Sequence, residues 1–236
     1  MRVDVLNDPR FTKIPNTPYV TLTEDTSLTH YALKEKTILL EHWLNDLPEV
    51  QTLQLGDVFL DIGALYGETC LIPAQRRCEV HAFEVHSLSF LCLCHNCPWP
   101  NVHKYNVAVG DGSLVKMSGA LGESGEGPRK NNLGTQMVET ANDGFPSVRI
   151  DDLNFENVTL AKIDVEGFEV RVLEGMRETI NRTKCRVLIE VYDALLAKQG
   201  FKRQDVLDFF ESVDYQWRVA IGRFEDERCD LLCEPK

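Results

Sequence analysis

The stretch "LAKIDVEGFEV" (residues 160–170) begins with the apolar residues of a buried strand and then becomes strongly charged. Lys162 and Asp164 stand two positions apart, so the alternation of side chains along a strand places both on one face. A carboxylate there could take a proton from a substrate or hold a metal ion, while the lysine could orient the reacting group or stabilise negative charge. The pair therefore predicts a reaction site where this strand ends.

The carboxylates that follow have a simpler interpretation. Gly167 can end the strand, and a helix is predicted to begin directly after it. Glu166 and Glu169 would then lie near the free N–H groups of a helix N-terminus, where negative charge is favourable. The alternative to a reaction site is thus a structural Lys162–Asp164 ion pair followed by two carboxylates at a helix start.

A second stretch, "DVFLDIGALYGET" (57–69), has the pattern of a strand, a tight glycine turn and a helix. Gly63 and Gly67 allow the backbone to turn sharply and to approach a ligand closely. Glu84 ends the next predicted strand, and a carboxylate about 20 residues beyond such a turn can hold a ribose diol. The stretch therefore predicts a site for a nucleoside-containing cofactor.

The same turn indicates which cofactor. A dinucleotide site requires a glycine at the position of Leu65, to admit the pyrophosphate. Asp61 would also repel a pyrophosphate, but it suits a ligand that carries an ammonium and a sulfonium group. S-adenosylmethionine (SAM) is such a ligand.

Strand and helix patterns alternate along the chain. Strands are predicted at 58–62, 79–84, 102–109, 159–164, 186–192, 215–221 and 228–234, and helices at about 66–76, 87–96, 168–181 and 203–213. This alternation is typical of an α/β fold with a mostly parallel sheet and helices on both faces. The last two strands have no helix between them, so they are predicted to form an antiparallel hairpin at one edge.

Two segments interrupt this alternation. Residues 27–47 have helical spacing, and residues 1–50 are expected to form an N-terminal helical cap, leaving 51–236 as the main domain. Residues 112–147 are rich in Gly, Ser and Asn and are long for a connection in a compact domain. They are predicted to be either a lid over the end of the 159–164 strand or a surface insertion.

The composition excludes several classes of protein. The 236 residues are 43% hydrophobic, which is enough for a core, and the net charge of -12 argues against nucleic acid and anionic membranes as main partners. No apolar run approaches the ~20 residues of a membrane span. The first residues lack the apolar segment of a signal peptide, so a cytoplasmic location is expected.

The chain contains eight cysteines, three of them in "LCLCHNC" (Cys92, Cys94 and Cys97). Zinc sites usually use C-x2-C pairs, and only "CHNC" fits that spacing, without a clear second pair. Small buried side chains are the favoured interpretation, with a metal site or a disulfide as alternatives. Three histidines lie within predicted elements and are interpreted as packing residues: His81, His95 and His103.

The segments "VFLDIGALYGET", "VHAFEVHSLSFLCLCHN", "NVAVGD", "NLGTQ", "VRIDDL", "AKIDVEGFEVRVLEGM" and "VLIEVY" follow one another as in FkbM-type SAM-dependent methyltransferases, which the chain resembles over about residues 56–192. The resemblance implies a Rossmann-like class I methyltransferase fold, with strand order 3-2-1-4-5-7-6 and the last strand antiparallel. It also implies methylation of a hydroxyl on a sugar, a glycan or a related small polyol. The chain departs from the family pattern at Leu65, where an Asn is common, and in its cysteine-rich helix end.

The implied strand order places the 159–164 strand beside the 58–62 strand, so residues at both ends would surround the cofactor's reactive methyl group. The predicted catalytic residues are Asp164 as general base or metal holder, Lys162, and Glu190 as a second polar wall or metal ligand. The predicted SAM contacts are Asp61, Gly63, Ala64, Gly67, Glu84, Asn106 and Ala108. Weaker candidates are His86 beside the adenosine, Asp111 in a turn, and Asn131, Asn132 and Thr135 as substrate or lid residues.

Three other functions are alternatives to this one. A methyltransferase with a different acceptor fits the same residues, although "KIDVEG" differs from the D/N-P-P-Y of enzymes that methylate base amino groups. An NAD-binding oxidoreductase is disfavoured, because Leu65 replaces the middle glycine of a dinucleotide site and Asp61 would repel a pyrophosphate. A non-catalytic SAM-binding module is disfavoured because polar groups at such a site have a desolvation cost unless they are used.

Overall fold

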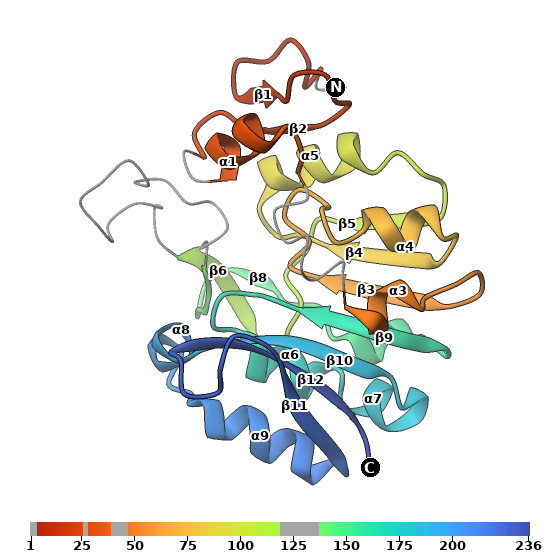
Figure 1. Ribbon diagram of the computed structural model, residues 1–236. Helices are drawn as coiled ribbons and strands as arrows, with labels where there is room; N and C mark the ends of the chain where they lie inside the picture. Colours follow the sequence, from red (N-terminus) through yellow and green to blue (C-terminus); the bar gives the residue numbers. More distant parts are fainter. Residues whose placement is uncertain (1–3, 26–27, 39–46, 119–136) are drawn as a thin grey trace.

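The computed structural model describes residues 4–25, 28–38, 47–118 and 137–236. A seven-stranded sheet crosses the molecule in the order β5-β4-β3-β9-β10-β12-β11 (Figure 1). Its strands are β3 (Val58–Ile62), β4 (Glu79–Phe83), β5 (Val102–Tyr105), β9 (Val158–Ile163), β10 (Arg186–Tyr192), β11 (Tyr215–Ile221) and β12 (Arg228–Pro235). Five neighbouring strands of this sheet are parallel: β5, β4, β3, β9 and β10. Strand β12 is antiparallel to both of its neighbours. The predicted α/β fold class is confirmed.

Helices cover both faces of the sheet because its strands are apolar on both sides. One core contains side chains of α3 (Pro48–Gln51), α4 (Leu71–Gln75) and α5 (Ser87–Asn96), packed on Phe59, Leu160 and Leu188. The other core contains side chains of α6 (Glu169–Gly175), α7 (Arg177–Thr183), α8 (Asp193–Lys198) and α9 (Arg203–Ser212), packed on Ile62 and Ile163. Alternate residues of each strand therefore point to opposite helical layers.

Four predicted elements differ markedly from the structure. The helix predicted at about 66–76 is shorter, because residues 66–70 form turns and α4 begins only at Leu71. The 102–109 strand ends at Tyr105, and the 168–181 helix is interrupted at Met176, whose φ of -125° is not helical. The 27–47 helix is α1 (Leu28–Glu35), which ends because Lys36 has a left-handed φ of 56° and the Thr37 N–H bonds back to the Ala32 carbonyl. Residues 39–46 of that prediction lie outside the described part of the chain.

The N-terminal segment forms a hairpin that the sequence did not predict. It consists of β1 (Phe11–Lys13) and β2 (Val20–Leu22), and β2 lies against α5 (Figure 1). The Asn96 side chain accepts from the Val20 N–H at 2.8 Å and donates to the Val20 carbonyl at 2.9 Å. This amide satisfies both backbone polar groups of Val20, so α5 stabilises a strand that is short on its own.

The Gly-rich insertion also contains strands. Three strands form an antiparallel sheet in the order β7-β6-β8. They are β6 (Leu114–Ser118), β7 (Met137–Thr140) and β8 (Phe145–Pro146). Gly144 permits this pairing, because a Cβ there would lie 2.1 Å from the Val115 carbonyl oxygen. Residues 119–136, which the lid prediction includes, lie outside the described residues.

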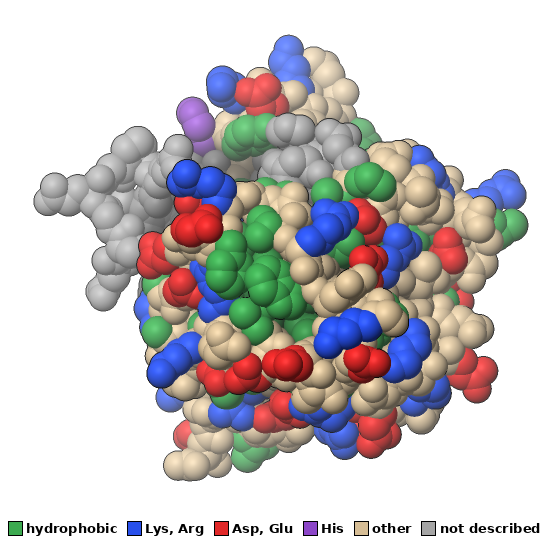
Figure 2. Space-filling model, turned by 60° about the horizontal axis from the view of Figure 1, so that its bottom comes forward, with side chains coloured by type: hydrophobic (Ala, Val, Ile, Leu, Met, Phe, Trp, Pro, Cys, Tyr) green, Lys and Arg blue, Asp and Glu red, His purple; other side chains and the backbone are tan. Residues whose placement is uncertain are grey.

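The surface carries charges of both signs. Figure 2 shows one face on which hydrophobic side chains gather at the centre and acidic and basic side chains are interspersed around them. Among the exposed large hydrophobic residues, Trp217 stacks on Phe224 with ring centroids 5.0 Å apart. Within the described residues, no helix has both the length and the apolar character needed to cross a membrane.

Candidate functional site

Strand register brings polar side chains together at one edge of the sheet. Phe59, Leu160 and Leu188 face the α4 and α5 layer, and each is followed two residues later by a charged residue on the same face. Asp61 lies opposite Lys162 across β3 and β9, and Glu190 lies opposite Asp230 across β10 and β12. The edge where the parallel strands end is therefore apolar inside and charged at its rim, as expected for a ligand site of an open α/β sheet. The charged residues that follow the apolar ones are Asp61, Lys162 and Glu190.

Lys162 is the centre of this edge. Its Nζ donates to the Gly63 carbonyl at 2.9 Å and lies 3.3 Å from Asp164 Oδ2 and 3.7 Å from Asp61 Oδ1. The side chains of Lys162 and Asp61 are 7% and 0% exposed, whereas that of Asp164 is 19% exposed. The predicted Lys162–Asp164 pair is thus present as an ion pair, and Asp164 is its accessible member.

Asp61 is held from the inside of the fold. Its Oδ2 accepts from the Thr69 hydroxyl and, at 3.1 Å, from the Cys70 thiol, both in the segment that leads from the glycine turn into α4. Its Oδ1 faces Lys162. These contacts connect the glycine turn to the Lys162–Asp164 pair, and a direct contact between Asp61 and a cofactor stays a prediction.

A cluster of three carboxylates lies beyond Lys162. Asp164, Glu166 and Glu190 each offer an oxygen, and the three atoms lie within 4.8 Å of one another. Burial raises the pKa of Glu166 and of Glu190, and the neighbouring carboxylates raise both further. Glu166 joins the cluster although β9 ends at Ile163, because its left-handed φ of 54° turns the chain there. Oxygen ligands of this kind suit a divalent cation such as Mg²⁺ or Mn²⁺.

Two residues of this edge were missed by the sequence interpretation. Arg228 forms an ion pair with Glu190. Burial and, to a smaller extent, the nearby Asp164 carboxylate raise the pKa of Asp230 to about 7. Both come from β12, which was interpreted only as an edge hairpin. The available signal was the alternation in "RCD" (228–230), which places Arg228 and Asp230 on one face of the strand.

Glu169 is the first residue of α6, as predicted, but its carboxylate holds the turn that precedes the helix. Its Oε1 accepts from the Gly167 N–H at 3.0 Å and the Val165 N–H at 3.3 Å. The residue is 1% exposed, and its Oε2 has no hydrogen-bond partner among the described residues. Burial raises the pKa of this carboxyl to about 7.

The raised pKa of Glu169 predicts a pH-dependent stability difference. A carboxyl whose pKa is near 4.5 when unfolded and about 7 when folded destabilises the folded state as pH rises through that interval. Glu169→Gln keeps the Oε1 acceptor but does not ionise. We expect it to match the wild type at pH 4 and to be more stable by about 1–3 kcal/mol at pH 8, measured by urea unfolding. Glu178→Gln, an exposed glutamate at the start of α7, is the control, and a difference independent of pH would contradict the prediction.

The glycine turn is held by Glu84. The Leu65 N–H donates to Glu84 Oε2 at 2.8 Å and the His86 N–H donates to Oε1 at 2.7 Å. Burial raises the pKa of Glu84 to about 7. Leu65 has a left-handed φ of 45°, a conformation that Asn adopts more readily, which gives a physical reason for the Asn common at this position.

The two predicted glycines have structural reasons of their own. A Cβ on Gly67 would lie 2.6 Å from the Cys97 sulfur, so this glycine allows α5 to approach the turn. A Cβ on Gly63 would lie 1.8 Å from the Asp164 carbonyl oxygen, so this glycine allows the ends of β3 and β9 to meet. Close approach is thus required by the protein itself, and a cofactor contact at either glycine stays a prediction.

Replacement of Gly63 should be much more costly than replacement of another left-handed glycine. Gly63 and Gly56 have φ values of 83° and 97°, but a Cβ on Gly56 would meet nothing within 4 Å. We expect Gly56→Ala to lose about 1–2 kcal/mol from backbone strain alone. Gly63→Ala should lose several kcal/mol more or prevent folding, as measured by urea unfolding and soluble yield. Equal losses in the two variants would show that the Asp164 contact relaxes freely.

The other predicted contacts lie in varied surroundings. The Asn106 side chain donates to the Glu84 and Val85 carbonyls at 2.8 and 3.0 Å, so it lies beside the proposed diol site. Ala64 and Ala108 are 1% and 4% exposed and belong to the two cores. Their contacts with SAM stay predictions.

The weaker candidates have local partners. His86 caps α5, with its Nδ1 2.9 Å from the Ser89 hydroxyl, and Asp111 forms an ion pair with Arg171 at 2.7 Å. His95 Nε2 lies 3.0 Å from the Pro18 carbonyl. Three further candidates lie outside the described residues: Asn131, Asn132 and Thr135.

The cysteines are free thiols, and seven of the eight are buried. The two side-chain groups that could hold a metal ion within the described residues contain no cysteine. Cys92 and Cys97 are 0% exposed, and the Cys97 thiol lies 3.5 Å from the Gly67 carbonyl. The seven buried cysteines are therefore small core side chains, as the favoured interpretation predicted, whereas Cys94 is only half-buried.

The sheet order, the helices on both faces and the charged edge beside a glycine turn define a class I methyltransferase fold. A sequence model of the Methyltransferase FkbM domain matches residues 61–217, which is more than half of the chain. The chain therefore belongs to the FkbM family of methyltransferases. A comparison with curated protein sequences finds no significant match.

Three solved structures are similar to the chain at low sequence identity, and the first of them shows the same fold. The methyltransferase FkbM from Methylobacillus flagellatus KT has a TM-score of 0.51 and 16% identity, over 81% of this chain and 47% of that one. A Streptococcus mutans protein in complex with SAH has a TM-score of 0.48 and 13% identity, over 78% and 91%. An rRNA methylase from Streptococcus thermophilus has a TM-score of 0.48 and 13% identity, over 79% and 91%. The chain thus spans about half of the M. flagellatus protein.

Proposed function

We propose that the chain is a SAM-dependent O-methyltransferase that acts on a hydroxyl of a sugar, a glycan or a related small polyol. One observation carries the proposal: the partly exposed Asp164 is held by the buried Lys162 at the strand edge beside the glycine turn. Membership of the FkbM family supports the reaction class. The proposed acceptor, a polyol hydroxyl, rests on the resemblance to FkbM-type enzymes, which methylate hydroxyl groups.

The residues of the turn fit SAM. Each Glu84 oxygen accepts one backbone N–H, which leaves a second lone pair on each oxygen for a ribose hydroxyl. The Asn106 side chain lies beside the same carboxylate, because it donates to the backbone carbonyls of Glu84 and Val85. Glu84 would therefore hold the ribose, and the turn at Gly63 and Leu65 would hold another part of the cofactor. When bound, SAM supplies a methyl group that its sulfonium already activates.

The protein must then orient a hydroxyl and accept its proton. Asp164 is the accessible carboxylate of the pair, and it takes the proton as the oxygen attacks the methyl carbon and the carbon–sulfur bond breaks. Lys162 remains between Asp61 and Asp164, where its charge orients the base and offsets negative charge on the attacking oxygen. The products are a methyl ether and S-adenosylhomocysteine.

A metal-assisted route would use the same side of the site. Asp164, Glu166 and Glu190 would hold a divalent cation that acidifies the hydroxyl. Turnover after exhaustive EDTA treatment distinguishes the routes, because the route through the Asp164 base alone retains activity.

A ligand screen tests the proposed cofactor. Thermal shifts are measured with SAM, S-adenosylhomocysteine, NAD and NADP, and the first two are expected to raise the melting temperature. Glu84→Gln should reduce that increase, because one hydroxyl acceptor is lost. If only NAD or NADP stabilised the protein, the methyltransferase proposal would be wrong. Binding of SAM without transfer to any polyol in a panel would instead favour a different acceptor or a non-catalytic module.

A further inference from the structure

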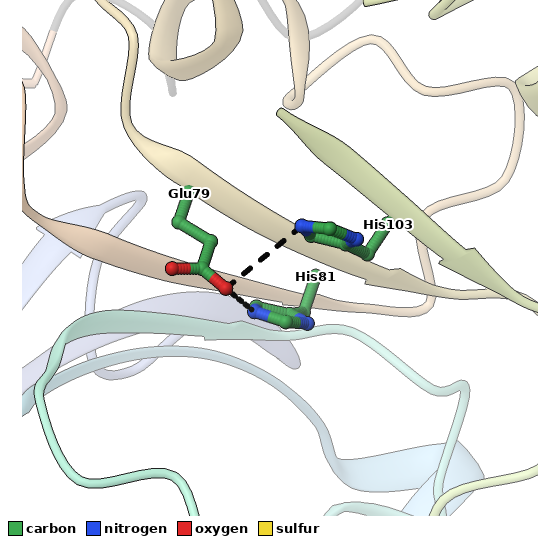
Figure 3. Close-up of side chains that lie close together, drawn as sticks. All are labelled: Glu79, His81 and His103. Atoms are coloured by element: carbon green, nitrogen blue, oxygen red, sulfur yellow. Dashed lines mark hydrogen bonds and ion pairs between the residues drawn. The ribbon is translucent and has the colours of Figure 1, made fainter. Parts of the chain in front are cut away.

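Two histidines and a glutamate lie together on β4 and β5, toward the N-terminal ends of these strands. The proposed reaction site lies at the opposite, carboxyl ends of the parallel strands. Figure 3 shows the Glu79 carboxylate reaching toward the rings of His81 and His103, which lie side by side. Glu79 Oε1 is 3.0 Å from His81 Nε2 and 3.8 Å from His103 Nε2. Glu79 begins β4, five residues or roughly 16 Å before Glu84, which directly follows that strand. The cluster is therefore separate from the catalytic edge.

Strand register produces this cluster. His81 of β4 is the direct partner of His103 of the parallel strand β5, and Glu79 is two residues before His81 on the same face. The two imidazole rings stack with centroids 4.9 Å apart and an interplanar angle of 21°. The ring of Phe155 packs edge-on against His81 at 4.5 Å. The rings are thus held with both Nε2 atoms turned toward Glu79.

We propose that Glu79, His81 and His103 form a binding site for a divalent transition-metal ion of the Zn²⁺ type. Their ligand atoms lie within 4.8 Å of one another. Ligand atoms around one tetrahedral Zn²⁺, each about 2.0–2.2 Å from the ion, are about 3.3 Å apart. The observed separations of 3.0 and 3.8 Å lie on either side of that value, so small side-chain rotations suffice.

The surroundings favour Zn²⁺ over Mg²⁺ and leave room for a water ligand. Imidazole nitrogen with one carboxylate suits Zn²⁺, Co²⁺ or Ni²⁺, whereas Mg²⁺ prefers oxygen ligands. The side chains of Glu79 and His103 are 54% and 46% exposed, so solvent reaches the site, while that of His81 is 8% exposed. A water molecule would occupy the fourth position.

Tyr105 supplies the outer contact that such sites use. Its hydroxyl lies 3.0 Å from His81 Nδ1 and can either donate or accept a hydrogen bond. When Nε2 binds a metal ion, Nδ1 carries the proton, and this N–H donates a hydrogen bond to the Tyr105 oxygen. The hydrogen bond fixes the tautomer and the orientation of the ring. Tyr105 is therefore a positioning residue of the proposed site.

The metal ion would join the edge strand β5 to β4. β5 is the last strand at one end of the seven-stranded sheet and is hydrogen-bonded only to β4 in that sheet. An ion bound by both strands stabilises the folded chain by mass action, in addition to their backbone hydrogen bonds. The proposed role is thus structural and independent of methyl transfer.

The test uses the full chain, freed of metal by chelation. Zn²⁺ titration by calorimetry, in the presence of excess Mg²⁺ to occupy oxygen-ligand sites, should show one equivalent bound, and Zn²⁺ should raise the melting temperature. His103→Ala should fold as the wild type does without metal, because its side chain is half exposed, and should bind Zn²⁺ at least tenfold more weakly. Tyr105→Phe should weaken binding about tenfold while keeping the ligands.

His30→Ala is the matched control, since His30 is an exposed histidine of α1. It should bind Zn²⁺ as the wild type does. Methyl transfer by His103→Ala should be unchanged, since His103 is outside the reaction site. Zn²⁺ binding of equal strength in His103→Ala and the wild type, or no Zn²⁺-dependent rise in melting temperature, would overturn the proposal.

Discussion

Asp164→Asn is expected to reduce turnover about 10²- to 10⁴-fold while leaving S-adenosylhomocysteine affinity within about threefold of the wild type. The amide has the shape of the carboxylate but cannot accept the substrate proton. Lys162 keeps its contacts with Asp61 and the Gly63 carbonyl, so the edge of the sheet should hold its geometry. The measurements are single-turnover methyl transfer to the acceptor found by a polyol panel and calorimetric binding of S-adenosylhomocysteine.

The control for this variant is Asp208→Asn, at an exposed aspartate of α9 whose side chain accepts from Gln204. Its turnover should equal that of the wild type. Retained turnover in Asp164→Asn would remove Asp164 from the mechanism. A loss of S-adenosylhomocysteine binding in parallel with turnover would show that Asp164 acts on the cofactor and not on the acceptor.

Lys162→Met is expected to lower the free energy of unfolding by about 3–5 kcal/mol. The side chain has a similar length, but Asp61 then remains as a fully buried carboxylate without its cation. Removal of one partner of a buried ion pair leaves an uncompensated charge, which costs far more than the pair gains. Urea unfolding at neutral pH measures the loss.

A second variant separates the ion pair from general packing. Asp61→Asn combined with Lys162→Met removes both charges and should recover a large part of the lost stability, although not the turnover. Glu174→Gln breaks an exposed ion pair with Arg177 and should cost no more than about 1 kcal/mol. If the double variant were as unstable as Lys162→Met alone, the loss would come from packing and not from an unpaired charge.

The two proposed metal sites offer different ligand atoms. The Asp164, Glu166 and Glu190 cluster offers only carboxylate oxygens, whereas the Glu79, His81 and His103 cluster offers two imidazole nitrogens. Mg²⁺ or Mn²⁺ would therefore act at the first cluster and Zn²⁺ at the second. A dependence of turnover on Mg²⁺ would thus leave the Zn²⁺ proposal untouched.

Much of the central sheet could be predicted from the sequence. The bounds predicted for β3, β10 and β11 are those of the structure, because each is a run of residues that favour strands. A glycine directly follows β3 and β11, and α8 directly follows β10. The same periodicity predicted that Lys162 and Asp164 would share a face, and their ion pair follows from it. The glycine turn was also readable, since few residues other than Gly tolerate such backbone angles.

Short elements that depend on distant partners could not be predicted in this way. The β1–β2 hairpin has strands of three residues, and its inner edge is completed by Asn96, more than seventy positions away. The strands of the Gly-rich insertion pair across a segment whose composition resembles a loop. α8 is a short helix that was not distinguished from the connection around it. Tertiary contacts, and not local preference, stabilise these elements.

The sequence alone determined which residues carry charge at the strand ends and on which face of their own strand they lie. Only the tertiary structure decided which of them meet, because register between strands depends on the packing of the whole sheet. That register placed Lys162 between Asp61 and Asp164, brought Arg228 to Glu190 from the antiparallel strand β12, and left Asp164 as the accessible carboxylate. The same register placed His81 beside His103, two residues that the sequence indicated only as packing.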